Sequence, residues 1–228
     1  MNDLSAEQLT GLSEKHLVLT DDGIKLHPLA AVAFKKMQQA AEQEGIALKI
    51  LSGFRSFERQ DRIWQSKIAG ERAVYNLQGD LVDLNPLDAL QKLHAVLLYS
   101  ALPGASRHHW GTDADIYDAS AVADDYQVQL QAAEYDAGGP FYRARQWLQQ
   151  HASQFGFFFP YQAYQGGVAA EPWHISYHPV ARRCEQLFSY EVLQQCLLQH
   201  PIALQKTVLE ALPDLYSRYV TNICRTLA

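Results

Sequence analysis

The sequence predicts an α+β fold, in which helices flank a small, mostly antiparallel sheet and continue into a helical C-terminal extension. Three observations predict this class. The chain has 228 residues, of which 48% are hydrophobic and 19% charged, as is typical of a folded globular protein. Short strand-like segments are separated by helical ones that are too irregular for a doubly wound parallel sheet. From Pro179 onward the pattern is helical throughout, with breaks expected at Pro201 and Pro213.

The N-terminal half supplies helices and one strand. Pro28 opens an apolar pattern at helical spacing that ends before Gly45, so we expect a helix over 28–44. Residues 46–52 alternate and contain β-branched side chains, which predicts a strand. Ser56 can cap a second helix that extends to about residue 69. A loop over 70–86 and a helix from Pro86 to about residue 99 follow.

The second half supplies the rest of the sheet. DADIYD (113–118) alternates apolar and polar residues and reads as a short strand, followed by a loop or hairpin over 119–139. Pro140 begins an amphipathic helix for which Gly156 is a suitable C-cap. FFFPY (157–161) and PWHISY (172–177) are two further strand-like segments.

Charge and composition exclude several classes of partner. With 19 Lys+Arg against 25 Asp+Glu the formal net charge is −6, which argues against a nucleic-acid or anionic-membrane partner. No apolar segment approaches the ~20 residues that span a bilayer. Three cysteines, with no CxxC pair, argue against a disulfide framework or a thiolate zinc site, so we expect reduced structural cysteines.

Two segments concentrate residues that carry chemistry. SRHHWGTDAD (106–115) holds two histidines and two aspartates, and EPWH (171–174) begins a predicted strand. A catalytic zinc site needs three protein ligands and an open position for water. It also needs a carboxylate that takes the proton from the metal-bound water. His108, Asp115 and His174 could supply the ligands and Glu171 the base.

These segments resemble a known family. Ser106, His108 and Asp115, with Glu171 and His174 downstream, are similar to the SxHxxGxAxD and ExxH motifs of the VanY-type zinc D-alanyl-D-alanine carboxypeptidases of the LAS group. The upstream SGFRSFERQ (52–60) resembles the SGYRS-x3-Q segment of that family. The resemblance covers roughly residues 28 to 178.

The resemblance implies a fold, a cofactor and a reaction. It implies the LAS/hedgehog-type metallopeptidase fold for a domain over 1–178. Residues 179–228 lie beyond the resemblance, and their apolar pattern predicts a helical extension that packs on this domain or forms a dimer face. It implies one Zn²⁺ per chain, bound by His108, Asp115 and His174, with Glu171 as general base and then acid. The substrate would be a peptidoglycan stem peptide, or another peptide ending in D-Ala-D-Ala, that loses its terminal D-alanine.

Further roles follow from the same resemblance. Arg55 would lie beside the scissile carbonyl, where it stabilises the oxyanion or anchors the substrate. Gln60 and Ser106 would hold the peptide backbone or its terminal carboxylate, and Trp173 would form a wall of the site.

One residue departs from the motif. Asp113 stands where the family has alanine, and in a strand it points to the same face as Asp115. We expect it either to support a ligand histidine or to contact the substrate and change specificity.

Other functions remain open. L,D-carboxypeptidase and endopeptidase specificities use the same site. Two histidines and a carboxylate also form the facial triad of Fe(II) oxygenases, but the spacing of seven and the nearby Glu171 favour hydrolysis. A zinc-dependent peptide-binding module without activity would have little need for Glu171. The N-terminus has no secretory pattern, which predicts a cytoplasmic protein, with periplasmic or exported action as the alternative.

Overall fold

A four-stranded antiparallel sheet lies at the centre of the computed structural model, which describes residues 3–225. Its strands are β3 (Leu48–Ser52), β4 (Asp113–Asp118), β6 (His174–Tyr177) and β5 (Phe157–Phe158), in that spatial order. Every neighbouring pair is antiparallel. The predicted small antiparallel sheet is therefore confirmed, with β4 and β6 as its two central strands.

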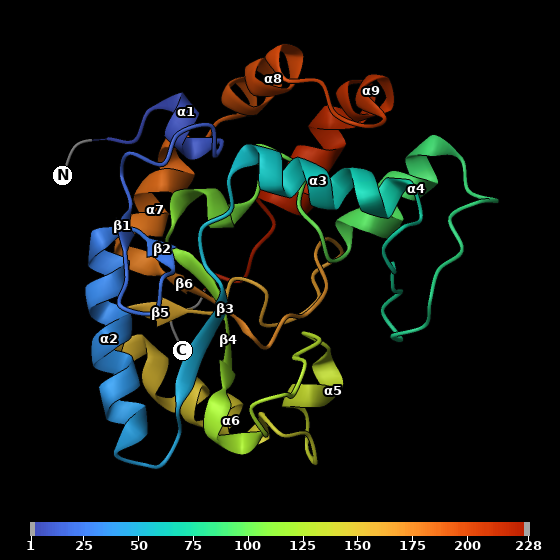
Figure 1. The fold of residues 1–228 in the computed structure, drawn as a ribbon. Coiled ribbons are helices and arrows are strands. Elements are labelled where there is room, and N and C mark those ends of the chain that lie inside the picture. The colour runs from blue at the N-terminus through green and yellow to red at the C-terminus, as the bar shows by residue number, and fades with distance from the viewer. Residues whose placement is uncertain (1–2, 226–228) are drawn as a thin grey trace.

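The two faces of the sheet differ because side chains alternate along each strand. One face carries apolar residues such as Ile116 and Ile175, both 0% exposed, and packs against α2 (Pro28–Glu42) and α6 (Tyr142–His151). Figure 1 shows both helices on the same side of the sheet. The other face carries polar residues of β4 and β6, so the polar chemistry of the sheet is concentrated on the side away from α2.

A second apolar core joins the remaining long helices. It contains residues of α3 (Phe57–Ile68), α4 (Ala89–Leu97), α7 (His178–Leu187), α8 (Tyr190–Gln199) and α9 (Gln205–Leu215). In Figure 1 α8 and α9 lie above α3. Trp64 of α3 is fully buried and donates its indole N–H to the Ala203 carbonyl at 3.0 Å. The described part of the C-terminal helices thus shares its core with α3 and α4; the last three residues, 226–228, lie outside the described residues.

Shorter elements complete the part of the chain that the structure describes. They are α1 (Ala6–Leu9), β1 (Val18–Leu19), β2 (Lys25–Leu26), α5 (Ala132–Tyr135), the 3₁₀ turns at Arg107–Trp110, Ala119–Ala121 and Ala152–Phe155, and a π-helical turn at Tyr216–Val220.

Several predicted helix ends are confirmed, but three predictions were wrong; the first concerns α6, which begins at Tyr142 and not at Pro140. Ser56 caps α3, and Gly156 ends the α6 region at φ 81°. The helix expected from Pro86 begins instead at Ala89, because the Asp88 side chain caps it by accepting from the Gln91 N–H. The break expected at Pro213 was wrong: the proline lies within α9, whose Leu212 and Leu215 are both buried at 0% exposure. The packing of these two leucines stabilises the helix although Pro213 cannot donate a backbone hydrogen bond.

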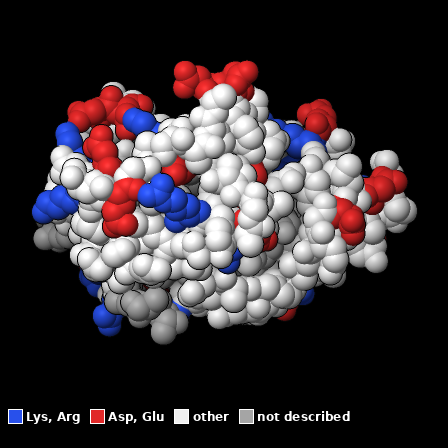
Figure 2. Space-filling model, turned by 90° about the horizontal axis from the view of Figure 1, so that it is seen from below, with Lys and Arg blue, Asp and Glu red and all other residues white. Residues whose placement is uncertain are grey.

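The surface carries no single dominant charge on the face shown in Figure 2, where acidic and basic side chains form small scattered groups. Among the described residues, no helix is both long and apolar enough to cross a bilayer. The three cysteines are free and buried.

Candidate active site

The register of the two central strands brings the aspartates of β4 beside the histidine of β6. Asp115 pairs directly with His174, and Asp113 with Ser176. Because these positions alternate with apolar Ala114 and Ile175, all four polar side chains lie on the same face of the sheet. Residues 59 positions apart in the chain thereby become neighbours.

His108 reaches the same face from the 3₁₀ turn that precedes β4. Gly111 ends this turn at φ 68°, a conformation that favours glycine, and the chain then enters the strand. The Nδ1–H of His108 donates to the Gly53 carbonyl at 2.8 Å, so its Nε2 is the nitrogen that carries the free lone pair. That nitrogen lies 3.4 Å from Asp115 Oδ2.

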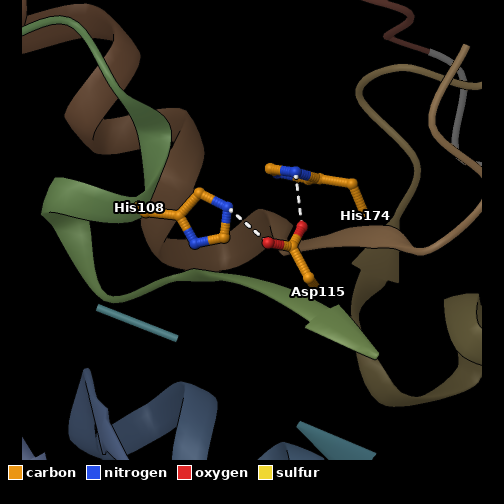
Figure 3. Close-up of side chains that lie close together, drawn as sticks. All are labelled: His108, Asp115 and His174. Carbon is orange, nitrogen blue, oxygen red and sulfur yellow. Dashed lines mark ion pairs between the residues drawn. The ribbon is translucent and has the colours of Figure 1, made fainter. Parts of the chain in front are cut away.

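The three predicted ligands converge. One ligand atom from each of His108, Asp115 and His174 lies within 4.8 Å of the others, and all three residues are buried. Figure 3 shows both imidazole rings beside the Asp115 carboxylate, each joined to one of its two oxygens by a dashed line. Two imidazoles and a carboxylate are a donor set that suits a divalent transition metal.

His174 is oriented by Asp113. Its Nε2 donates to Asp113 Oδ1 at 3.0 Å, which directs Nδ1 toward Asp115 Oδ1 and Glu171 Oε2, each 3.3 Å away. Burial alone would lower the pKa of His174, but the bonds to these three carboxylates raise it well above its ordinary value. A metal ion would compete with that proton for Nδ1.

A buried ion-pair network lies behind His174. The Arg107 guanidinium is 4% exposed and donates to Asp113 Oδ1, Glu185 Oε1 and Ser176 Oγ, each at 2.8 Å. Burial would raise the pKa of Asp113, but the charge of Arg107 and the bond from His174 hold it well below its usual range. Asp113 therefore stays ionised and acts on His174 from behind; its side chain does not line the cavity described below.

Glu171 is placed by a tight turn. The His174 N–H donates to the Glu171 carbonyl at 3.1 Å, with Pro172 at the second position of the turn. Glu171 is 8% exposed, and burial raises the pKa of its carboxyl group above the ordinary value. The structure thus places a buried carboxyl group of raised pKa beside the ligand triad.

Arg55 contacts two of the predicted ligand side chains directly. Its Nη2 is 2.8 Å from Asp115 Oδ2 and 2.7 Å from His108 Nε2, and its Nε donates to Ser52 Oγ at 3.1 Å. Gln60, which we expected to contact substrate, instead accepts from Arg55 Nη1 at 3.2 Å and donates to the Ala101 carbonyl at 2.8 Å. It is 0% exposed and does not line the cavity, so the structure places it behind Arg55.

The site opens into a cavity of about 1020 Å³. Ser106, Trp173 and Arg55, which we expect to contact substrate, line it, and so does Glu171, the expected base. Sequence reasoning missed other lining or supporting residues. Tyr161 packs its ring 4.9 Å from that of His174, and Lys67 lines the cavity from α3. Arg107 lies inside the motif but carried no signal of its own, because its partner Glu185 is 78 residues away in the chain.

The buried His-Asp-His cluster, with an adjacent carboxylate and a cationic side chain facing one cavity, is the arrangement of a hydrolytic metallopeptidase. Residues 23–180 match the family model VanY, D-alanyl-D-alanine carboxypeptidase. The chain belongs to this family.

Individual proteins give the extent of the likeness. An uncharacterized protein of Haemophilus influenzae is 36% identical over 121 residues, which are 52% of this chain and 92% of that protein. The structure of the LdcB LD-carboxypeptidase is 25% identical, with a TM-score of 0.52 over 74% of this chain and 71% of the other. VanYB in complex with D-Ala-D-Ala is 22% identical, with a TM-score of 0.52 over 81% of this chain and 88% of the other.

A VanY D,D-pentapeptidase from a VanB-type resistance cassette, in complex with Zn(II), shows the same fold. It is 22% identical, with a TM-score of 0.51, and the likeness covers 72% of this chain and 81% of that one. The α+β architecture predicted from the sequence is thus shared with these metallopeptidases.

Proposed function

We propose that the protein is a zinc-dependent carboxypeptidase that removes the C-terminal D-alanine from peptidoglycan-type peptides ending in D-Ala-D-Ala. One observation carries the proposal: Glu171 Oε2 lies 3.3 Å from His174 Nδ1, beside the buried triad, in a cavity large enough for a peptide. Membership of the VanY family supports the reaction class.

The residues present fit zinc. His108 and His174 each have one ring nitrogen committed to a protein acceptor, the Gly53 carbonyl or Asp113, and the other directed at Asp115. This is how ligand histidines are held at protein metal sites. Zinc bound by His108, Asp115 and His174 would polarise the scissile carbonyl and acidify water.

The chain's own residues would move the proton and steady the charge. Glu171 takes a proton from the attacking water and returns it to the leaving amine, for which its raised pKa is suited. Arg55 places a guanidinium where negative charge develops on the carbonyl oxygen. Ser106 and Trp173 line the cavity and would position the peptide.

A second specificity has its own support. The likeness to the LdcB LD-carboxypeptidase favours a peptide whose penultimate residue is of L-configuration at the cleaved bond. Both reactions release one D-alanine and use the same ligand set, so they differ in the substrate and not in the chemistry.

The test is a mass-spectrometric product assay with zinc-loaded protein. We expect a stem pentapeptide ending in D-Ala-D-Ala to lose one alanine, and the loss to stop on chelation. Cleavage of the tetrapeptide alone would assign the L,D-specificity instead. In Glu171→Gln we expect bound zinc to remain and turnover to disappear; loss of zinc in parallel would show that Glu171 is a ligand and refute its role as base.

A further inference from the structure

Basic side chains line the cavity along one side of α3 and beyond it. Arg59 and Lys67 lie eight residues apart on the helix, with Ile63 midway between them, and all three line the cavity. Residues four apart share one face of a helix, so α3 presents a single stripe to the cavity. Arg72, shortly after the helix, lines it as well. We call Arg59, Lys67 and Arg72 the α3 basic cluster.

The cluster has no acidic partner. Among residues 3–225, none of its three side chains takes part in a salt bridge, whereas Arg55 and Arg107 both do. Lys67 is half-buried, and burial together with the charges of Arg72 and Arg55 lowers its pKa to about 8, against an opposing effect of Glu171. Burial and the charges of Arg55, Arg62 and Arg72 also lower the pKa of Arg59. The chain as a whole has a net charge of −6, yet three cations that repel one another lie beside the same cavity. An anion bound from outside would offset this repulsion.

The dimensions indicate which part of a peptide would reach the cluster. The cavity of about 1020 Å³ is at the upper end of the range for small-ligand sites. Arg59 and Lys67 are ~12 Å apart along the helix axis, from a rise of about 1.5 Å per residue. An extended peptide covers that distance in roughly three to four residues. The single residue released by a carboxypeptidase is too short to extend from Arg55 along the whole cluster, but the upstream part of the substrate is long enough.

We propose that the α3 basic cluster is a subsite for a carboxylate carried by the substrate upstream of the cleaved bond, so that acidic stem peptides are preferred over neutral ones. The inference rests on the proposed function and deepens it by naming the substrate class. Its chemistry is a charge-assisted hydrogen bond from Lys67 or a guanidinium to a carboxylate in a partly water-excluded cavity.

The test uses two synthetic pentapeptides ending in D-Ala-D-Ala that differ only at the third residue, glutamate against glutamine. We expect kcat/KM of the zinc-loaded protein to favour the glutamate peptide by about tenfold, the ratio that one such bond supplies. In Lys67→Gln the ratio should fall to near one, and in Lys67→Arg it should persist. Arg62→Gln is the matched control, since Arg62 is exposed on the same helix and does not line the cavity; it should keep the wild-type ratio.

Two results would overturn the subsite: equal kcat/KM for both peptides in the wild type, or an unchanged ratio in Lys67→Gln. If Lys67→Gln keeps the ratio but loses kcat/KM on both peptides, Lys67 instead contacts the terminal carboxylate of the substrate. Calorimetric binding of the same peptides to zinc-loaded Glu171→Gln separates the subsite from the reaction. A binding preference without turnover of either peptide in the wild type would refute the proposed function and leave the subsite standing.

Discussion

Asp113→Ala tests whether the network behind His174 supports the site. The substitution introduces the residue that the family motif has at this position. In this chain the Asp113 carboxylate accepts from Arg107 Nε at 2.8 Å, Ser176 Oγ at 2.9 Å, Thr112 Oγ1 at 2.5 Å and His174 Nε2 at 3.0 Å. Each of these donors is buried. Removing the carboxylate therefore leaves four buried donors short of an acceptor. In the metal-free protein two of them, Arg107 and the protonated His174, carry a positive charge.

The expected cost is large on both stability and metal binding. Breaking a buried ion pair by removing one partner costs about 3–5 kcal/mol, and Arg107 would keep only Glu185 as a charged partner. Loss of the acceptor that orients a ligand histidine typically lowers metal affinity by about 10–100-fold. We expect values in both ranges.

Stability is best measured by urea unfolding with chelator present, so that bound metal does not contribute. Zinc affinity is measured separately by competition with a chromophoric chelator. Asp21→Ala is the control, because Asp21 makes an equally short bridge of 2.7 Å to Lys35 on the exposed surface; neither quantity should change. Wild-type stability and zinc affinity in Asp113→Ala would refute the reasoning.

Three further predictions concern other buried contacts. His109 is 0% exposed and neutral, accepting from the Gly104 N–H and donating to the Arg55 carbonyl, and burial lowers its pKa to about 3. In the unfolded chain the His109 imidazole binds a proton below pH ~6.5, whereas in the folded protein it stays neutral. The free energy of unfolding should therefore fall by about 3 kcal/mol between pH 7 and pH 4. An equally steep pH dependence in His109→Gln would contradict this. Arg55→Ala should lower kcat/KM by about 10²–10³ with zinc content, measured by atomic emission, unchanged; an unaltered rate removes Arg55 from the reaction. Gly167→Ala should lower the urea midpoint of unfolding, because a Cβ there would lie 2.0 Å from the Arg218 carbonyl oxygen. An unchanged midpoint would show that the backbone can shift to accommodate the Cβ without loss of stability.

The helix caps and the strand face that carries Asp115 could be predicted because their signals are local. The alternation of DADIYD places Asp113 and Asp115 on one strand face, and the structure shows both there, 0% and 2% exposed. Ser56 and Gly156 act as the caps that their residue types predict. In each case the property depends on neighbours within a few residues.

The supporting contacts could not be predicted because they join distant segments. Arg107 depends on Glu185, and Gln60 is turned away from the cavity by Arg55 and the Ala101 carbonyl. Lys67 gave no local signal either, since an amphipathic helix exposes lysines routinely. Only the fold shows that this one faces the cavity.

Asp113 and the C-terminal extension depend on each other physically. An ionised carboxylate buried beside a metal ligand needs a buried cation, and Arg107 needs in turn the carboxylate of Glu185, on a helix that continues beyond the family match over 23–180. The departure from the motif and the helix after it are thus parts of one network. If so, Asp113→Ala combined with Arg107→Met should recover part of the stability lost in Asp113→Ala, since no unpaired buried charge remains. Zinc affinity should stay low, because His174 still lacks its acceptor. Additive losses of stability in a double-mutant cycle would show that Asp113 and Arg107 act independently. Recovery of zinc affinity along with stability would show that His174 does not need the Asp113 acceptor.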